Sequence, residues 1–397
     1  MTEKTKAFDF VNWIELPETY APVPKSLGQN KHTDFTTNWA VASSMEFWKV
    51  LEHINSVMKK ANLGYPDTLW FRGHSKDSYV LLPSLIRSYF SRKQQCSLPQ
   101  YQRKLLESFL ARSRGTSELA DTGVVRRDNE QIEYIADMQH YGVPSNLLDW
   151  SEDISVSLYF STAGHSAGDA AIYVFQPYYY NFVRNEIIRM FPTKHHDAEG
   201  NSNFATTDTS IGGMLPNFSA HFNLTAPQYN NYVIGPYSWD NLTDSRKWRK
   251  RDPLDDDAVN LESAPLLPLA MQIPRNNPRI KRQSGMFLAF NLCEFPQEKD
   301  EKDSKGIYHG FRHIELEEIQ KFYMCSDELQ RRIAGKDDHP AYAAMKNRYP
   351  FLYKIHLRST AIPDLQRITA MLGKKKDTVY PELYNIGRQI ELEVPSL

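Results

Sequence analysis

The chain has 397 residues and a mass of 46.0 kDa; 41% of the residues are hydrophobic and 24% charged, which excludes a disordered, collagen-like or coiled-coil protein. Lys and Arg number 47 and Asp and Glu 48, so the net charge of −1 excludes a global field that would attract DNA or an anionic membrane. The N-terminus lacks the apolar core of a secretion signal, and no run of roughly eighteen apolar residues predicts a membrane-spanning helix. Three cysteines far apart in the sequence favour reduced thiols. We therefore expect a cytoplasmic globular protein.

Periodic patterns begin after a first segment, residues 1–40, that is expected to lie on the surface as an extension. Ser43 and Glu46 have the spacing of a capping box, and apolar residues at steps of three and four predict a helix that ends near Asn62. Further helices are predicted over residues 101–114, 129–140, 153–162, 363–372 and 382–390. Strands are predicted over residues 68–73, 171–175, 270–273, 285–290 and 352–357.

A long middle segment, residues 178–266, is rich in Asn, Tyr, Pro and Thr and shows little periodicity. A connection of this length indicates an insertion that packs outside the sheet and borders a functional site. The domain itself is then split into residues 41–177 and 267–397. Its strands and helices do not alternate strictly, which favours an α+β fold with a mixed or antiparallel central sheet flanked by helices.

The first candidate for function is the run Trp70-Phe71-Arg72-Gly73 at the end of a short apolar strand. The glycine allows the backbone to turn sharply after the arginine. The guanidinium of Arg72 offers five donors in a planar fork suited to phosphate or carboxylate. The alternative is that Arg72 pairs with a carboxylate at the edge of the core.

The second candidate is the block Gln139-His140-Tyr141-Gly142-Val143-Pro144-Ser145-Asn146-Leu147-Leu148-Asp149-Trp150-Ser151. In it a helix end, a Gly-Pro turn and a two-leucine strand lead into the next helix. In one interpretation the strand presents the carboxylate of Asp149, the indole of Trp150 and the hydroxyl of Ser151 to a cleft. In the other, Asp149 or Ser151 is the N-cap of the following helix.

The third candidate is Gln283-Ser284-Gly285, where a basic stretch enters an apolar strand. The side chain of Gln283 is a neutral hydrogen-bond donor and acceptor. In the alternative interpretation the segment is an edge strand whose charged first residues are solvated. All three candidates lie at the ends of helices or strands, where such folds place ligands. We therefore expect six residues to surround one cleft: Arg72, Gln139, His140, Asp149, Ser151 and Gln283.

Two other polar clusters carry less weight. His195-His196-Asp197 lacks a second pair of ligands, so no metal is expected. The basic residues 246–251 are followed at once by the acidic residues 255–257, which favours a self-compensating surface loop.

Together, these segments resemble the FRG domain, a bacterial family named after a Phe/Tyr-Arg-Gly motif that residues 71–73 match. Residues 83–87 are similar to the family's Leu-x-Pro-Ser-Leu-x-Arg, and residues 139–151 to its QHYG-[LV]-P-[ST]-x-LLDW-[ST] block. Residues 157–160 resemble the ALYFA helix that follows, and residues 378–383 the Phe-Pro-Asp-Leu segment.

A more distant likeness is to the ADP-ribosyltransferase superfamily, which implies an ADP-ribosyltransferase-like fold with NAD as the substrate. In that superfamily an arginine that ends a first strand holds the dinucleotide phosphates, and a serine braces the nicotinamide ribose. The resemblance implies these roles for Arg72 and Ser151. A catalytic glutamate is expected on a later strand, but Gly285 stands there, so either Asp149 or Gln283 would replace it or transfer activity would be absent.

The resemblance covers roughly residues 40–175 and 267–392. It also implies ligand-binding roles for Phe71, Gly73, Arg87, Gln139, His140, Tyr141 and Trp150. The aromatic rings of Tyr141 and Trp150 would stack on a base or on nicotinamide.

Three interpretations remain open from the sequence. In the first the protein is an NAD-using enzyme, ADP-ribosyltransferase-like or NAD-cleaving, that serves as a toxin or in phage defence; a carboxylate would stabilise its cationic transition state. In the second Arg72 and Asp149 bind a nucleotide or a partner without catalysis. In the third the two residues pair inside a closed core and only stabilise the fold. The protein or nucleic acid that would be the target is left open.

Overall fold

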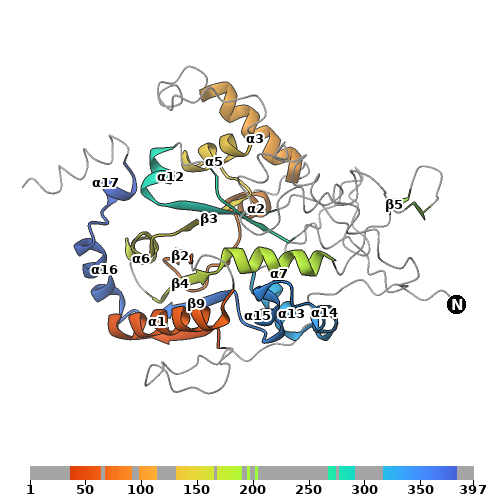
Figure 1. Cartoon of the computed structure of the whole chain (residues 1–397). Helices are drawn as coiled ribbons and strands as arrows, with labels where there is room; N and C mark the ends of the chain where they lie inside the picture. Colours follow the sequence, from red (N-terminus) through yellow and green to blue (C-terminus); the bar gives the residue numbers. More distant parts are fainter. Residues whose placement is uncertain are drawn as a thin grey trace, which may run out of the picture.

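A computed structural model describes ten segments of the chain: residues 36–63, 68–91, 98–113, 131–164, 168–189, 195–196, 202–203, 267–273, 277–290 and 316–381. They form one mixed sheet surrounded by helices (Figure 1). Within these segments, no helix combines the length and the apolar character that crossing a membrane requires. The predicted combination of a mixed, mainly antiparallel sheet with flanking helices is confirmed at this level.

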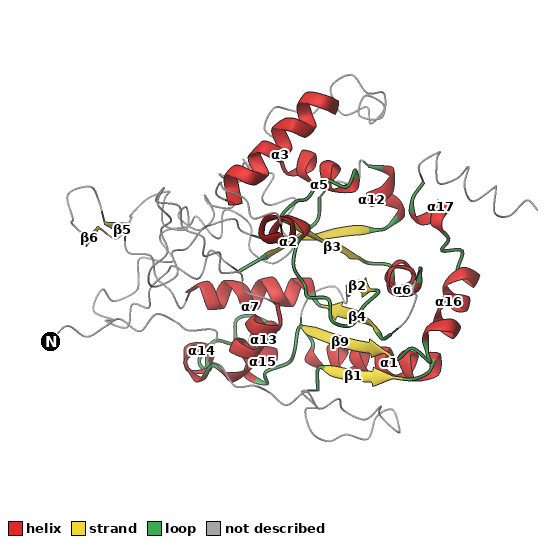
Figure 2. Cartoon of the chain, turned by 180° about the vertical axis from the view of Figure 1, so that it is seen from behind, coloured by secondary structure: helices red, strands yellow, loops and turns green. Residues whose placement is uncertain are grey.

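The described strands form a seven-stranded sheet in the order β1-β9-β4-β2-β3-β8-β7, and Figure 2 shows β3, β2, β4, β9 and β1 in this succession. Their bounds are Asn38–Val41 (β1), Trp70–His74 (β2), Leu147–Ser151 (β3), Ala170–Phe175 (β4), Leu269–Met271 (β7), Gly285–Ala289 (β8) and Leu352–Leu357 (β9). In this sheet β1 runs parallel to β9, and the other neighbours are antiparallel. A separate two-stranded ladder joins β5 (His195–His196) to β6 (Ser202–Asn203). The strands predicted from the sequence are present, and β1 was missed because it begins inside the predicted surface extension.

Helices lie on both sides of the sheet (Figure 1). Their bounds are Ser44–Ala61 (α1), Ser84–Ser91 (α2), Leu98–Ser113 (α3), Gln131–His140 (α5), Ile154–Thr162 (α6), Pro177–Arg189 (α7), Pro278–Arg282 (α12), Leu316–Cys325 (α13), Asp327–Ile333 (α14), Pro340–Lys346 (α15), Ile362–Met371 (α16) and Lys376–Val379 (α17). The predicted helices that correspond to α1, α3, α5, α6 and α16 are confirmed. The helix predicted over residues 382–390 lies outside the described residues.

Helix α1 begins and ends where its sequence predicts. The Oγ of Ser43 accepts a hydrogen bond from the amide of Glu46 at 3.3 Å, and the Glu46 carboxylate accepts one from the amide of Ala42 at 2.7 Å. Asn62 stops the helix in the left-handed region, with φ of 45°. The apolar stripe between these ends is buried: Phe47, Val50, Ile54 and Met58.

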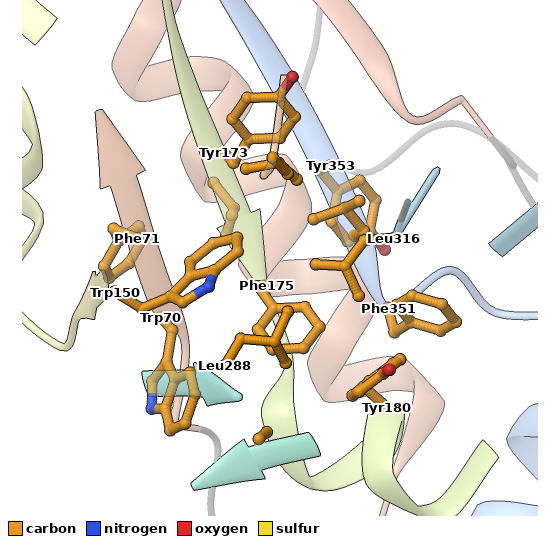
Figure 3. Close-up of a cluster of buried hydrophobic side chains, with 14 of the residues drawn as sticks. Trp70, Phe71, Trp150, Tyr173, Phe175, Tyr180, Leu288, Leu316, Phe351 and Tyr353 are labelled. Carbon is orange, nitrogen blue, oxygen red and sulfur yellow. The ribbon is translucent and has the colours of Figure 1, made fainter. Parts of the chain in front are cut away.

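The side chains of the central strands alternate between two covered faces. Helix α6 lies against Gly73 of β2 on one face. On the other, Phe175 of β4 packs against Tyr180 of α7, with ring centroids 5.2 Å apart. Trp70 and Trp150 join Phe175 in this cluster (Figure 3). Burial of aromatic rings of this size contributes about 1.5–3 kcal/mol per side chain to folding.

Strands β2 and β3 are neighbours, yet they pair at one position, Phe71 opposite Ser151. Each of them pairs over five positions with its other neighbour. The two strands therefore separate on the side of Gly73 and Asp149, and we call this opening the seam. Directly opposite residues in antiparallel strands share a face and successive residues alternate, so Arg72 and Asp149 leave the sheet on opposite faces.

Gly73 marks the closest approach of α6 to the sheet. A Cβ atom at this position would lie 1.9 Å from the carbonyl oxygen of Ser157 and 2.9 Å from the amide nitrogen of Ser161. The backbone continues as a regular strand to His74, so the predicted sharp turn after Arg72 is wrong. The glycine is needed for close packing of a helix on a strand.

The predicted insertion needs a correction at its start. Residues 177–189 form α7, whose Tyr179, Tyr180, Phe182, Val183 and Ile187 are buried in the core. The sequence analysis missed this helix because Tyr, Asn and Phe have modest helix propensity and blur the periodic pattern. Apart from β5 and β6, the remainder of residues 178–266 lies outside the described residues, and the other domain limits stay predictions.

The predicted edge strand after the basic stretch is also wrong. Residues 278–282 form the short helix α12, capped by Asn277, whose side chain accepts a hydrogen bond from the amide of Arg279. Strand β8 follows and lies inside the sheet, between β3 and β7, with all its residues buried. Its partner β3 comes from a distant part of the chain, which a local pattern does not reveal.

We expect Gly73→Ala to lower the free energy of unfolding by about 3 kcal/mol or more, because the added methyl group meets the backbone of α6, which cannot rotate away. Urea unfolding followed by circular dichroism measures this change. Gly335→Ala is the matched control, since a Cβ atom there meets nothing within 4 Å. Equal stability of the two variants would contradict the packing argument.

Candidate functional site

The seam contains an open pocket of about 220 Å³. It is bounded by β2, α2, the end of α5 with the following turn, and β3. The lining residues are Arg72, Ser84, Arg87, Gln139, Gly142, Val143, Leu147, Leu148 and Asp149. The structure therefore brings together four of the residues predicted from the sequence: Arg72, Arg87, Gln139 and Asp149. Among the described residues, no group of three or more His, Cys, Asp or Glu side chains is arranged to hold a metal ion.

Arg72 bridges the seam from β2. Its Nη1 donates to the carbonyl oxygen of Asp149, and its Nε donates to Nε2 of His74 at 2.9 Å. Burial lowers the pKa of Arg72 to about 10, the Asp149 carboxylate opposes this, and the nearby Arg87 adds to it. Arg72 thus stays charged at neutral pH. Three of its five N–H groups have no partner in the described part of the chain and can bind a ligand.

His74 fixes the plane of the Arg72 guanidinium. Since Nε2 of His74 accepts from Arg72, the ring proton is assigned to Nδ1, which donates to the carbonyl oxygen of Tyr79 at 3.2 Å. Burial, followed by the positive charge of Arg72, lowers the pKa of His74 to about 3. The imidazole is therefore neutral and links Arg72 to the loop that follows β2.

The Asp149 carboxylate is oriented by a chain of hydrogen bonds. Nε2 of Gln139 donates to Oδ1 of Asp149 at 2.5 Å, and the hydroxyl of Ser145 donates to Oε1 of Gln139. Ser145 Oγ also accepts from the amide of Leu147 at 3.1 Å, so its single proton is directed to Gln139 and the Gln139 amino group faces Asp149. Oδ2 of Asp149 receives no hydrogen bond from the described residues and is available to a ligand.

Helix α2 adds a second guanidinium. Arg87 is exposed, and its Nη1 donates to the carbonyl oxygen of Leu82 at 2.7 Å. The helix start is held beside the turn after α5 because Ser84 Oγ accepts from the amide of Ser145 at 3.2 Å, and the amide of Leu85 donates to the carbonyl oxygen of Ser145 at 3.0 Å. The pocket thus combines two guanidinium groups with one carboxylate.

Ser151 and Gln283 do not reach the pocket, so the expectation of a single cleft is wrong for both. Ser151 is buried, donates to the carbonyl oxygen of Gln283 at 2.6 Å and accepts from the amide of Asp153 at 2.9 Å. Gln283 Nε2 donates to the carbonyl oxygen of Val379 at 3.1 Å. The N-cap of α6 is Asp153, not Asp149 or Ser151. Ser151 and Gln283 brace the junction of β3, α6 and β8.

Two aromatic residues expected to contact a ligand lie in the core instead. Trp150 has 2% of its surface exposed, and its ring centroid is 4.9 Å from that of Phe175. Phe71 is 9% exposed and pairs with Ser151. Trp150 packs on Phe175 in the core and is absent from the lining of the pocket, so it does not stack on a ligand there.

His140 and Tyr141 lie at the end of α5, outside the pocket. His140 is buried, and its carbonyl oxygen accepts a hydrogen bond from Nη1 of Arg279. Tyr141 is exposed and stacks on Phe109, with ring centroids 6.0 Å apart. The expectation that His140 borders the cleft is therefore wrong, and Tyr141, which was expected to stack on a ligand, does not line the pocket, although the next residue, Gly142, does.

Arg72 and Asp149 do not form the closed ion pair of the purely structural interpretation. Arg72 bonds the main-chain carbonyl of Asp149, while the carboxylate accepts from Gln139. This follows from the register, which sends the two side chains to opposite faces of the sheet. The guanidinium and the carboxylate both border an open pocket, which is the arrangement expected of a ligand site.

Sequence analysis missed three residues that organise the site: His74, Ser84 and Ser145. Serines at helix starts and in turns are usually caps, so their local pattern gave no reason to place them in the pocket. A signal for His74 was present, because it stands two residues after Arg72 on the same face of β2.

The comparison with protein families matches the FRG domain to residues 67–170, a range that contains every residue lining the pocket. This chain contains an FRG domain. The family expected from the sequence motifs is thus confirmed. Searches of the curated proteins and of the solved structures give no match.

The FRG domain of this chain is completed by strands from outside the matched range. Strand β8, which pairs with all five residues of β3, and strand β9, which pairs with β4, both come from the C-terminal part. The matched range supplies the pocket, while the flanking chain supplies neighbours that hold its strands in place.

The neutral His74 makes the folded protein sensitive to acid. Its pKa is about 3 in the folded protein and 6.5 in an unfolded chain, so between these pH values the unfolded chain binds a proton that the folded one excludes. The free energy of unfolding therefore decreases as the pH is lowered through this window, by up to about 1.4 kcal/mol per pH unit. We expect the free energy of unfolding of His74→Gln to decrease less steeply than that of the parent as the pH is lowered, because glutamine does not titrate but can accept the hydrogen bond from Arg72. Urea unfolding at a series of pH values measures this slope. Equal pH slopes in the variant and the parent would contradict the neutral state of His74.

Proposed function

We propose that this FRG domain protein binds NAD at the seam pocket and cleaves the bond between nicotinamide and ribose. The ADP-ribosyl group would then pass to water or to the nucleophile of a target. The observation that carries the proposal is that two guanidinium groups and one carboxylate border the same open pocket. A role as a toxin or in phage defence rests on the family resemblance alone.

The positive groups suit the phosphates of a dinucleotide. Arg72 is held rigidly by His74 and by the Asp149 carbonyl, with N–H groups left over for a ligand. Arg87 approaches from α2 and, within the described part of the chain, donates one hydrogen bond, to the carbonyl oxygen of Leu82. Paired guanidinium groups bind phosphate oxygens by charge-assisted hydrogen bonds, which are shorter and stronger than neutral ones.

The carboxylate suits the bond that breaks. As the ribose–nicotinamide C–N bond lengthens, its electron pair leaves with nicotinamide and the ribose carbon gains positive charge. Asp149, held by Gln139, offers a fixed negative charge at the pocket wall without reorganisation during the reaction. Water or a target hydroxyl then forms the new C–O bond and loses its proton.

An ADP-ribosyltransferase-like fold is part of this proposal, and the residues support it unequally. Arg72 on a central strand suits the role of phosphate binder. Ser151 is buried and bonded to main-chain groups, which does not suit a residue that braces the ribose. This favours a second candidate function, a nucleotide-binding module without turnover.

The deciding experiment is incubation of the full chain with NAD, with free nicotinamide followed by chromatography; ATP and nucleic acid are tested in parallel. The proposal expects time-dependent nicotinamide release. Saturable NAD binding without release would favour the binding module, and the absence of both would contradict either function.

We expect Arg87→Gln to weaken NAD binding by roughly tenfold, because one charge-assisted contact to phosphate is lost. The melting temperature should hardly change, since Arg87 is exposed. Isothermal titration and thermal unfolding measure the two effects. Arg331→Gln removes a comparably exposed arginine from α14 and serves as the control; an equal loss of affinity there would contradict a pocket-specific role.

We expect Asp149→Asn to reduce nicotinamide release by roughly a hundredfold or more, like the removal of other single electrostatic groups. Asparagine keeps an oxygen that can accept from Gln139 and leaves the carbonyl bonded by Arg72 unchanged, so the fold should persist. Turnover assays combined with circular dichroism test this. A folded variant that retains full turnover would remove Asp149 from the mechanism.

A further inference from the structure

We infer that the seam pocket selects singly charged phosphate linkages, such as those of a dinucleotide, and rejects doubly charged terminal phosphates. The inference rests on the proposed role of the pocket as a phosphate site and deepens it by naming the substrate class. It makes Asp149 a determinant of specificity as well as a participant in the reaction.

The charges of the pocket carry the argument. Among its lining residues, Arg72 and Arg87 each contribute one positive charge and Asp149 one negative charge, which leaves an excess of one positive charge. The Asp149 carboxylate and the Arg87 guanidinium both act electrostatically on Arg72. A bridging phosphate with one negative charge balances this excess, whereas a terminal phosphate carries about two above pH 6 and leaves a net negative charge.

The positions of the hydrogen-bond donors in the pocket agree with this count of charges. Three N–H groups of Arg72 and four of Arg87 have no partner within the described segments and can donate to a ligand. Oδ2 of Asp149 accepts no hydrogen bond from the described residues, so this oxygen is left to face a ligand. A bound phosphate therefore faces the guanidinium groups on one side and a carboxylate on the other, which penalises each additional negative charge.

The size of the pocket points to a small ligand. A volume of about 220 Å³ holds a phosphate with part of a sugar and is below the roughly 300–1,000 Å³ usual for whole ligands. The remainder of a dinucleotide would extend through the open side. The same linkage occurs in nucleic acid, but the net charge of −1 lacks the basic field that tracks a strand. We therefore assign the pocket to a dinucleotide.

ADP-ribose and ADP form a matched pair of probes. Both phosphates of ADP-ribose are singly charged, whereas the β-phosphate of ADP is terminal and doubly charged at pH 8. Neither probe contains nicotinamide, so their binding does not depend on NAD cleavage, and this test can succeed or fail independently of turnover. Isothermal titration of the full chain should show ADP-ribose binding at least several times more tightly than ADP.

Variants of the charged lining residues test whether the charge of the pocket, and not its shape, causes the preference for ADP-ribose over ADP. Asp149→Asn should strengthen ADP binding more than ADP-ribose binding, so that the affinity ratio falls roughly tenfold for the one charge of difference. Arg87→Gln removes a positive charge and should therefore raise the ratio of ADP-ribose affinity to ADP affinity. This second variant keeps the test valid if Asp149→Asn does not fold. Asp337→Asn removes an exposed carboxylate after α14 and should leave the ratio unchanged.

Several outcomes would overturn the inference. These are equal or stronger binding of ADP by the parent, a ratio that is unchanged in the folded Asp149→Asn and Arg87→Gln variants, or no binding of either probe. A ratio that shifts equally in Asp337→Asn would assign the effect to the general field of the protein. Binding of a decathymidylate strand without binding of ADP-ribose would overturn the assignment to a dinucleotide.

Discussion

The hydrogen bond from Arg72 to the main-chain carbonyl of Asp149 is the interaction on which the site depends. Where β2 and β3 separate, carbonyl and amide groups in the middle of the sheet lose their usual partners, and a buried polar group without a partner is costly. The guanidinium satisfies one of these groups and keeps the opening from closing. A single side chain thus stabilises the sheet and provides one of the charges of the pocket, so removing it entirely would change both properties at once.

The elements with strong local signals were predictable from the sequence, and those defined by distant partners were not. Helix α1 has a cap, a periodic apolar stripe and a stop residue, each of which acts within one or two turns. Helix α7 is held by the aromatic core, so its pattern is weak until the sheet is present. The interior position of β8 depends on its pairing with β3 across a long sequence separation, in addition to its pairing with the nearby β7.

The same distinction applies to the candidate site. Arg72 and Asp149 were found because a charged residue inside an apolar strand is unusual in any context. Trp150 and Ser151 are the two residues that follow Asp149 in the sequence, but pleating sends Trp150 to the opposite face from Asp149, and the junction with β8 occupies Ser151. Closeness in the sequence therefore led us to expect too many residues of this block in contact with a ligand. The remainder of the pocket wall comes from α2 and the turn after α5.

The tight contact between Gly73 and α6 has a consequence for how the strand is placed. Phe71, Arg72 and Gly73 meet three different surroundings within one strand: the core, the seam and the backbone of a helix. A shift of β2 by one residue would exchange the faces of all its side chains and drive Arg72 or His74 into the space that only a glycine fits. The Phe-Arg-Gly triplet therefore fixes the register of β2 in the sheet. This register sets the position of the Arg72 guanidinium before any ligand binds.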